Sequence, residues 1–412
     1  MKTSHKLLKI LNSFIIKKRR TIYAIPHPNC KVDFYDLINY SSDNVLCLVN
    51  QMMADNYKNK TTIYLEYYRE NREKELLKYI KENNNNENLE IILLKSDTIF
   101  NGIEHIYMNL RNRFKRYQCK IWLTDTSSLM LDEKCKRQVL IDMNYSTPFK
   151  MAPKPFDFSY IDYSFETSLL CATVHSALYR IRLENSICVG FPRNDHLFES
   201  KKAWKVRQWI KRKTDIEYNY LLVYAPTYRE YNGAFSNSIL GFQIEQDELD
   251  DFLKKYGILL ITKFHPLQDV KVEHNSKYLV PYEKTFDFGL YDLLSISSAL
   301  ISDYSSVMHD YVITGKPIIL NCFDETEFDE TRGFSFDPIS TVFPGPVIRN
   351  KNDFFKTIEE YIINKTKIFD NEKVKRLFHK YPDNKSSERA NLLMGEILDE
   401  SVTAQTCLPK NT

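Results

Sequence analysis

The sequence lacks the features that mark several large classes of protein. No stretch approaches the roughly 20 consecutive apolar residues that cross a bilayer, and the N-terminus has no apolar signal-peptide core with a small-residue cleavage site. The eight cysteines are scattered, without a CxxC pair or a Cys/His cluster at zinc spacing. We therefore expect a cytoplasmic protein in a reducing compartment, with no transmembrane helix and no zinc module.

The sequence also has no large excess of positive or negative charge. The chain has 57 basic and 54 acidic residues, a net charge of only +3, so no overall field attracts nucleic acid. No group of aspartates has metal-site spacing, so we predict no metal ligands, and the need for a divalent metal stays open. At 412 residues and 43% hydrophobic content, the chain is long enough for two domains with full cores. The sequence indicates no certain cofactor.

Residues 1–20 are the one strongly charged segment at an end of the chain. They hold seven Lys or Arg and no acid, with apolar residues at near-helical spacing, which predicts a basic amphipathic helix. Such a helix can bind an anionic membrane surface, or it can pack on the domain with a solvated basic face. The sequence leaves both interpretations open.

From Thr21 onward, short β-rich runs alternate with helical ones, which predicts parallel sheets covered by helices. The basic segment Lys201–Lys213 is predicted as a connecting helix, and a second α/β series begins at Tyr220–Tyr224. The prediction is an α/β protein with two Rossmann-like domains facing a central cleft, residues 1–200 and 201–412.

One stretch of the second half predicts a βαβ unit with a polar turn. The strand Ala299–Ile301 runs into Ser302, Asp303 and a Ser305–Ser306 pair before a helix, and Gly315 ends that helix. Free backbone N–H groups and hydroxyls at the start of a helix can hold phosphate oxygens. An ordinary capped helix with nothing bound is the alternative.

Two more strands of this half end in polar side chains. Thr227 and Arg229 follow one predicted strand, and Lys263 and His265 follow another. Parallel strands deliver their carboxyl ends to one edge, so we expect these groups to converge with the serine turn. A guanidinium, hydroxyls and a histidine suit a diphosphate, with His265 acting as a cation or in proton transfer.

Seven short strings of the sequence resemble the CDP-glycerol glycerophosphotransferase family, the teichoic acid primases and polymerases. They are GFPRND (190–195), YAPTYRE (224–230), KFHP (263–266), SDYSSVMHDY (302–311), RGFSFD (332–337), PGPV (344–347) and DNKSSER (383–389).

The resemblance implies a GT-B-type fold that binds a CDP-linked donor in the C-terminal domain and the acceptor from the N-terminal one. Similar enzymes move glycerol phosphate or ribitol phosphate from CDP-glycerol or CDP-ribitol to a hydroxyl of a lipid-linked glycan, teichoic acid or capsular polymer, releasing CMP. Carried over by motif, the catalytic or donor-binding residues are His265, Thr227, Arg229, Lys263, Ser302, Asp303, Ser305, Ser306, Arg332 and Gly333. The linker motif supplies Pro192, Arg193, Asn194 and Asp195.

The sequence departs from the family at one position. The family has a Trp-His-Gly-Thr-Pro-Leu-Lys motif whose His is a proposed general base, and Tyr145 stands at that position here. Because a tyrosine has a reference pKa near 10, it is a poor proton acceptor at neutral pH. Either another group such as Asp142 or His27 takes the proton, or the acceptor differs, or this half has lost its activity.

Three functions are therefore weighed. The leading hypothesis is a polyol-phosphate transferase on the inner face of the bacterial cell membrane, in teichoic acid or capsule synthesis. The second is a GT-B glycosyltransferase that uses a nucleotide sugar. The third is a non-catalytic partner protein that binds the donor without turnover, which Tyr145 makes plausible.

Overall fold

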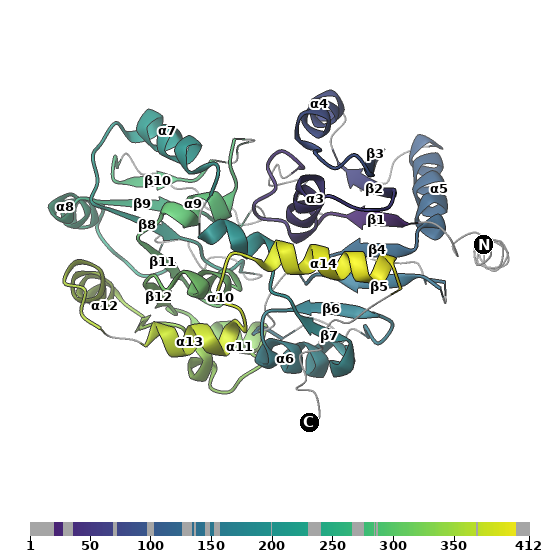
Figure 1. Cartoon of the computed structure of the whole chain (residues 1–412). Helices are drawn as coiled ribbons and strands as arrows, with labels where there is room; N and C mark the ends of the chain where they lie inside the picture. Colours follow the sequence, from purple (N-terminus) through teal and green to yellow (C-terminus); the bar gives the residue numbers. More distant parts are fainter. Residues whose placement is uncertain are drawn as a thin grey trace. The chain divides into compact units, whose positions relative to one another are not determined.

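The structure is a computed structural model of the 412-residue chain, shown in Figure 1. It describes residues 20–27, 36–68, 72–96, 103–125, 134–135, 137–144, 149–151, 157–198, 200–229, 240–265, 276–283, 285, 287–367 and 370–400, without the side chains of 103–109 and 371. Residues 1–19 lie outside this set, so the predicted basic helix stays a prediction.

The chain forms two compact units. The first comprises Met1–Tyr145, Phe156–Asp195 and Lys385–Thr412, and the second comprises Ser146–Pro155 and His196–Asn384. The division between Asp195 and His196 lies near the predicted boundary at residue 200. The C-terminal helix clusters with the first unit, whereas the sequence had placed it in the C-terminal domain.

A seven-stranded parallel sheet forms the first unit, in the order β3-β2-β1-β4-β5-β6-β7. Its strands are β1 (Thr21–Ile25), β2 (Thr61–Tyr67), β3 (Leu89–Lys95), β4 (Ile121–Thr124), β5 (Val139–Asp142), β6 (Tyr163–Glu166) and β7 (Ser186–Cys188). Its helices are α3 (Asn44–Ala54), α4 (Glu73–Asn83), α5 (Ile103–Gln118), α6 (Leu169–Tyr179) and α14 (Ser386–Leu398), with short 3₁₀ helices at Leu183–Asn185 and from Pro192.

A six-stranded parallel sheet forms the second unit, in the order β10-β9-β8-β11-β12-β13. Its strands are β8 (Tyr220–Tyr224), β9 (Ile258–Thr262), β10 (Leu279–Pro281), β11 (Ala299–Ser302), β12 (Ile318–Asn321) and β13 (Val347–Ile348). Its helices are α7 (Ala203–Thr214), α8 (Gln246–Tyr256), α9 (Leu290–Ile296), α10 (Val307–Tyr311), α11 (Glu325–Thr331), α12 (Lys351–Thr357) and α13 (Asn371–Phe378), with a π-helix at Ile358–Ile363 and 3₁₀ turns at Val312–Thr314 and Ile339–Val342.

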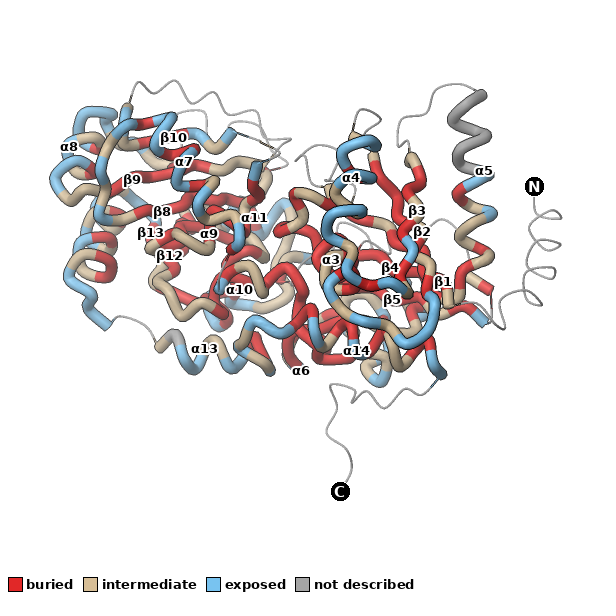
Figure 2. Tube along the Cα trace, turned by 45° about the horizontal axis from the view of Figure 1, so that its top comes forward, coloured by how far each residue is buried: buried red, intermediate tan, exposed pale blue. Residues whose placement is uncertain are grey.

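Both sheets are buried on both faces, as parallel sheets require. In β1, Ile22 and Ala24 enter the same core as α3 and α14, while Tyr23 between them enters the core on the opposite face. The strands are accordingly almost wholly buried in Figure 2. Helix α14 joins the first unit because Leu393 and Ile397 pack into that core. The predicted α/β class is confirmed.

The βαβ unit around the serine turn forms as predicted, but its helix is short. Helix α10 ends at Tyr311 and continues as a 3₁₀ turn, and Gly315 ends it with φ at +69°, where a side chain would be strained. Because α10 has fewer than two turns, its dipole adds little to the turn. The hydroxyls and backbone geometry of the turn must supply most of any attraction for phosphate.

The linker motif has a structural explanation within the first unit. The Asp195 carboxylate accepts hydrogen bonds from the backbone N–H groups of Ser386 (2.9 Å) and Ser387 (2.8 Å), the first two residues of α14. The Arg389 guanidinium donates to the Val189 carbonyl at 2.9 Å. The motif therefore caps and orients the C-terminal helix.

The cysteines give a mixed result. Five of them, Cys47, Cys119, Cys135, Cys171 and Cys322, are buried free thiols. Cys188 in β7 is disulfide-bonded. Within the described ranges, no helix is both long and apolar enough to cross a bilayer.

Candidate active site

The carboxyl ends of three strands meet at one edge of the second sheet. Tyr224, the last residue of β8, pairs with Thr262 of β9 on one side and with Ile301 of β11 on the other. The residues that follow each strand therefore start from the same level of the sheet. The predicted convergence of the Thr227, Lys263 and Ser302 segments on one edge holds in the structure.

Arg229 lies in a buried ion network at this edge. Its guanidinium donates to both carboxylate oxygens of Asp324 (2.6 and 2.9 Å), to Asp303 (2.8 Å) and to the Thr227 carbonyl (2.8 Å). The side chains of Arg229 and Asp303 are fully buried. Burial alone would lower the pKa of Arg229, but Asp303 and Asp324 raise it above its usual value, so the group stays charged.

This network also sets the backbone around it. The other Asp303 oxygen accepts the backbone N–H of Thr227 at 2.8 Å, so one carboxylate ties the end of β8 to the end of β11. Asp324, which follows β12, was missed by the sequence analysis, although the rule that strand ends converge applies to it as well. Direct contact of Arg229 with a diphosphate stays a prediction, and the bonds shown are those of a residue that holds the edge together.

Three further hydroxyl groups lie in the loops that follow these strands, on Thr227, Ser305 and Ser306. The Thr227 hydroxyl is buried and has no hydrogen-bond partner in the described part of the chain. Ser305 and Ser306 are half-buried, and Ser306 begins α10 without a side-chain cap bond. The Ser302 hydroxyl, in contrast, donates a hydrogen bond to the Ala225 carbonyl at 2.7 Å. The hydroxyls of Thr227, Ser305 and Ser306 are therefore suited to donate hydrogen bonds to a bound phosphate. The Ser302 hydroxyl instead links the end of β11 to the residue after β8.

His265 and Lys263 follow β9 and are half-buried. The Lys263 backbone N–H donates to the Tyr224 carbonyl at 2.7 Å, which continues the β8–β9 pairing past the end of the strand. The His265 ring lies against the Tyr228 ring, with centroids 5.2 Å apart. The β8 and β9 loops therefore contact each other through this ring pair, and their roles in catalysis stay predictions.

Gly333, which follows Arg332, lies in a short antiparallel contact with residues 149–151. Lys150 forms a bridge with Phe334, and the Met151 N–H donates to the Gly333 carbonyl at 3.0 Å. Phe149 stacks on His309 of α10, with ring centroids 3.8 Å apart. The second unit thus includes a segment that the sequence analysis assigned to the N-terminal domain.

The predicted acceptor-side residues lie at the end of β5 in the first unit. Asp142 is buried, and its carboxylate accepts the Asn144 N–H at 2.8 Å. Tyr145 lies outside the described residues, so the structure says nothing about its environment. Whether either residue takes the proton from the acceptor stays a prediction.

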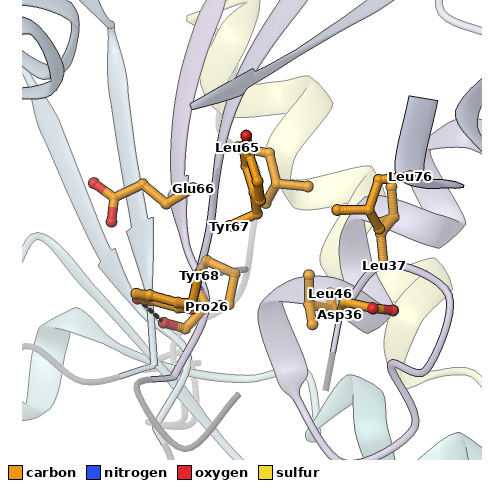
Figure 3. A pocket seen from close by; sticks show the side chains of 9 residues that line it. All are labelled: Pro26, Asp36, Leu37, Leu46, Leu65, Glu66, Tyr67, Tyr68 and Leu76. Carbon is orange, nitrogen blue, oxygen red and sulfur yellow. Dashed lines mark hydrogen bonds between the residues drawn. The ribbon is translucent and has the colours of Figure 1, made fainter. Parts of the chain in front are cut away.

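Two cavities lie away from this edge. A cavity of about 20 Å³ in the first unit, with room for about one water molecule, lies between β2, α3 and α4 beside Glu66 and Tyr67 (Figure 3). A larger one of about 560 Å³ lies at the amino ends of β8, β11 and β12, beside Tyr220, Ser298 and Pro317. Neither matches the predicted donor site. The small cavity belongs to the first unit, and the larger one lies at the amino ends of its strands, whereas α/β folds bind ligands at the carboxyl ends.

No metal site is seen at either sheet. Among the residues that the structure describes, no three His, Cys, Asp or Glu side chains gather closely enough to hold a metal ion.

Comparison with known proteins decides the family. The family model described as CDP-Glycerol:Poly(glycerophosphate) glycerophosphotransferase matches residues 47–393. The chain belongs to this family. The resemblance stated from the sequence is thereby confirmed, and the match extends it into the N-terminal half.

The relatives of this family member act in teichoic acid synthesis by name. It is 28% identical over 222 residues to the teichoic acid ribitol-phosphate polymerase TarK of Staphylococcus aureus (strain NCTC 8325 / PS 47), covering 52% of this chain and 41% of the relative. It is 25% identical over 309 residues to the teichoic acid glycerol-phosphate primase of Bacillus subtilis (strain 168), covering 73% of this chain and 74% of the primase. The chain thus spans less than half the length of the first of these relatives.

The fold has a solved counterpart. The wall teichoic acid polymerase TagF superposes with a TM-score of 0.67 at 17% identity, covering 97% of this chain and 94% of that chain. This likeness, with two parallel sheets in two units, confirms the GT-B-type fold.

Proposed function

We propose that this family member transfers glycerol phosphate or ribitol phosphate from a CDP-linked donor to a hydroxyl of a lipid-linked glycan, teichoic acid or capsular polymer. The observation that carries this proposal is the carboxyl edge of the second sheet. There the Thr227 hydroxyl, which has no partner among the described residues, and the half-buried Ser305 and Ser306 follow strand ends held in register by the Arg229–Asp303–Asp324 network.

In the proposed reaction, the acceptor oxygen attacks the distal phosphorus of the CDP-polyol. A new acceptor O–P bond forms, the bridging P–O bond breaks, and CMP leaves with the electron pair of that bond. Negative charge grows on the leaving and equatorial oxygens, where hydroxyl donors and the cationic groups of Lys263, His265 and Arg332 stabilise it. The acceptor proton passes to a base in the first unit, for which Asp142 and His27 are the candidates besides Tyr145 at the family's base position.

The setting of the reaction is part of the proposal. An acceptor attached to a membrane lipid places the protein at the cytoplasmic face of the cell membrane. The seven basic residues within 1–20 supply the attraction to anionic lipid. A role in capsule as well as wall polymer synthesis follows from the same chemistry, since both polymers can contain polyol phosphates.

The experiment is incubation of the full chain with CDP-glycerol or CDP-ribitol and lipid-linked acceptors, with CMP release as the readout. We expect acceptor-dependent CMP release with one of the two donors. Absence of release with both donors overturns the proposal. Tight donor binding without turnover selects the non-catalytic partner, and preferred binding of a UDP- or CMP-sugar selects the glycosyltransferase.

A further inference from the structure

A buried carboxylate in the first unit has no part in the chemistry described so far. Glu166, the last residue of β6, is fully buried and pairs with the buried His175 of α6 at 2.8 Å. A charged or polar group is costly to bury unless its bonds are satisfied. Glu166 meets this condition with three donors, namely His175, the Ser164 hydroxyl at 2.9 Å and the Asn144 side-chain amide at 3.1 Å.

The third donor, Asn144, has an unusual backbone. Its φ is +55°, in the left-handed region, which non-glycine residues adopt uncommonly and asparagine more readily than most. Its backbone N–H donates to Asp142 at 2.8 Å, and its carbonyl accepts from the Asn44 side chain at 2.8 Å. Both backbone groups of this residue are thus fixed inside the unit.

The Asn144 side chain is fixed as well. Its amide nitrogen lies 2.7 Å from the Phe165 carbonyl and 2.9 Å from the Ser164 hydroxyl, besides its bond to Glu166. The local bond to Asp142 is enough to make a turn after a strand. The additional network, which reaches β6 and α6, fixes the direction of that turn.

Two candidate bases flank this residue in the sequence. Asp142 bonds directly to the Asn144 N–H, and Tyr145 is the next residue along the chain. A rotation at Asn144 therefore changes the hydrogen bond that its N–H donates to the Asp142 carboxylate. A misplacement of about 1 Å in a reacting group can lower a rate by about a hundredfold.

We propose that Glu166 is a positioning residue for the acceptor side of the transfer reaction. Supported by His175, it holds Asn144 in its left-handed conformation and so fixes the hydrogen bond that the Asn144 N–H donates to the candidate base Asp142. The inference rests on the proposed function, and it adds a residue that no motif of the sequence singles out.

The test compares Glu166→Gln with Glu66→Gln. Glu66 is a matched control because it is a buried glutamate of the same sheet, bonded to Tyr23 and Arg116 and remote in sequence from Asn144. With CMP release as the assay, we expect kcat/KM for the acceptor to fall at least tenfold in Glu166→Gln. The Kd of CDP-glycerol should stay within twofold, and Glu66→Gln should change neither constant by more than about threefold.

Two variants at Asn144 separate its backbone from its side chain. Glycine at position 144 adopts the left-handed conformation without strain but has no side-chain amide. Alanine has no amide and is also strained in that conformation, so Asn144→Ala should be less active than Asn144→Gly. Asn144→Asp sets two carboxylates against each other, and adding Glu166→Gln to it should restore part of the lost activity. Equal losses in Glu166→Gln and Glu66→Gln, or a donor Kd that changes as much as the acceptor constant, overturn the inference.

A readout without activity separates this inference from the proposed function. If the wild type releases no CMP with either donor, the proposed function fails, and hydrogen exchange of the Asn144 amide still decides the positioning role. Faster exchange at Asn144 in Glu166→Gln but not in Glu66→Gln supports the role. Unchanged exchange in Glu166→Gln overturns it.

Discussion

Replacing Arg229 with lysine tests whether the buried ion network holds the donor edge together. The change keeps the positive charge but removes the planar fork that reaches Asp324, Asp303 and the Thr227 carbonyl together. A single ammonium can satisfy one carboxylate well, so at least two charge-assisted hydrogen bonds are lost. At about 1.5–3 kcal/mol each, the expected loss in unfolding free energy is about 3–6 kcal/mol.

The assay is urea unfolding of the second unit, followed by tyrosine and tryptophan fluorescence. Arg349→Lys is the matched control, because Arg349 is 54% exposed and pairs with Glu325 at the surface. An exposed pair of this kind contributes about 1 kcal/mol or less.

Equal, small effects of the two lysine substitutions refute the reasoning. They would mean that the Arg229 bonds to Asp303 and Asp324 contribute no more than surface contacts. A stable Arg229→Lys variant that has lost donor binding would instead return Arg229 to the direct diphosphate contact expected from the sequence.

Three further predictions follow from described contacts. Ser305→Ala with Ser306→Ala should weaken CDP-glycerol binding about tenfold or more in calorimetry, because two hydroxyl donors are lost, whereas Ser340→Ala, an exposed site of the same unit, should leave the Kd unchanged. Burial lowers the pKa of His309 well below its usual value, so below about pH 6.5 the unfolded chain binds a proton that the folded chain does not. The unfolding free energy should therefore fall by about 1.4 kcal/mol per pH unit as the pH drops. In urea unfolding between pH 7 and pH 5, His309→Phe should remove this part of the pH dependence. Asp195→Ala should lower the unfolding free energy of the first unit by about 1–2 kcal/mol, because helix α14 loses its cap, with Asp195→Asn retaining more of the stability.

The alternation of short apolar runs with helical segments predicted most of the fold. The predicted strand Tyr220–Tyr224 agrees with β8 residue for residue, because fully buried parallel strands are continuous apolar runs in sequence. Strand β6 was missed, since it is only four residues long and contains Ser164 and Glu166. Its polar residues are buried through hydrogen bonds that no local pattern reveals.

The site was predictable to the extent that strand ends converge. That rule placed Thr227 and His265 at one carboxyl edge of the second sheet, but it could not distinguish a cation that faces outward from one enclosed by carboxylates. Arg229 belongs to the second kind because Asp324, far along the chain, closes over it. The C-terminal helix was assigned to the wrong half for a similar reason, since only the packed structure shows its apolar face in the first core.

The most direct measurement is a structure of the full chain with CDP-glycerol or CDP-ribitol bound. We expect the diphosphate at the carboxyl edge of the second sheet, within hydrogen-bond distance of the Ser305, Ser306 and Thr227 hydroxyls and beside His265. A donor bound instead in the 560 Å³ cavity at the amino ends of β8, β11 and β12 contradicts this account of the site.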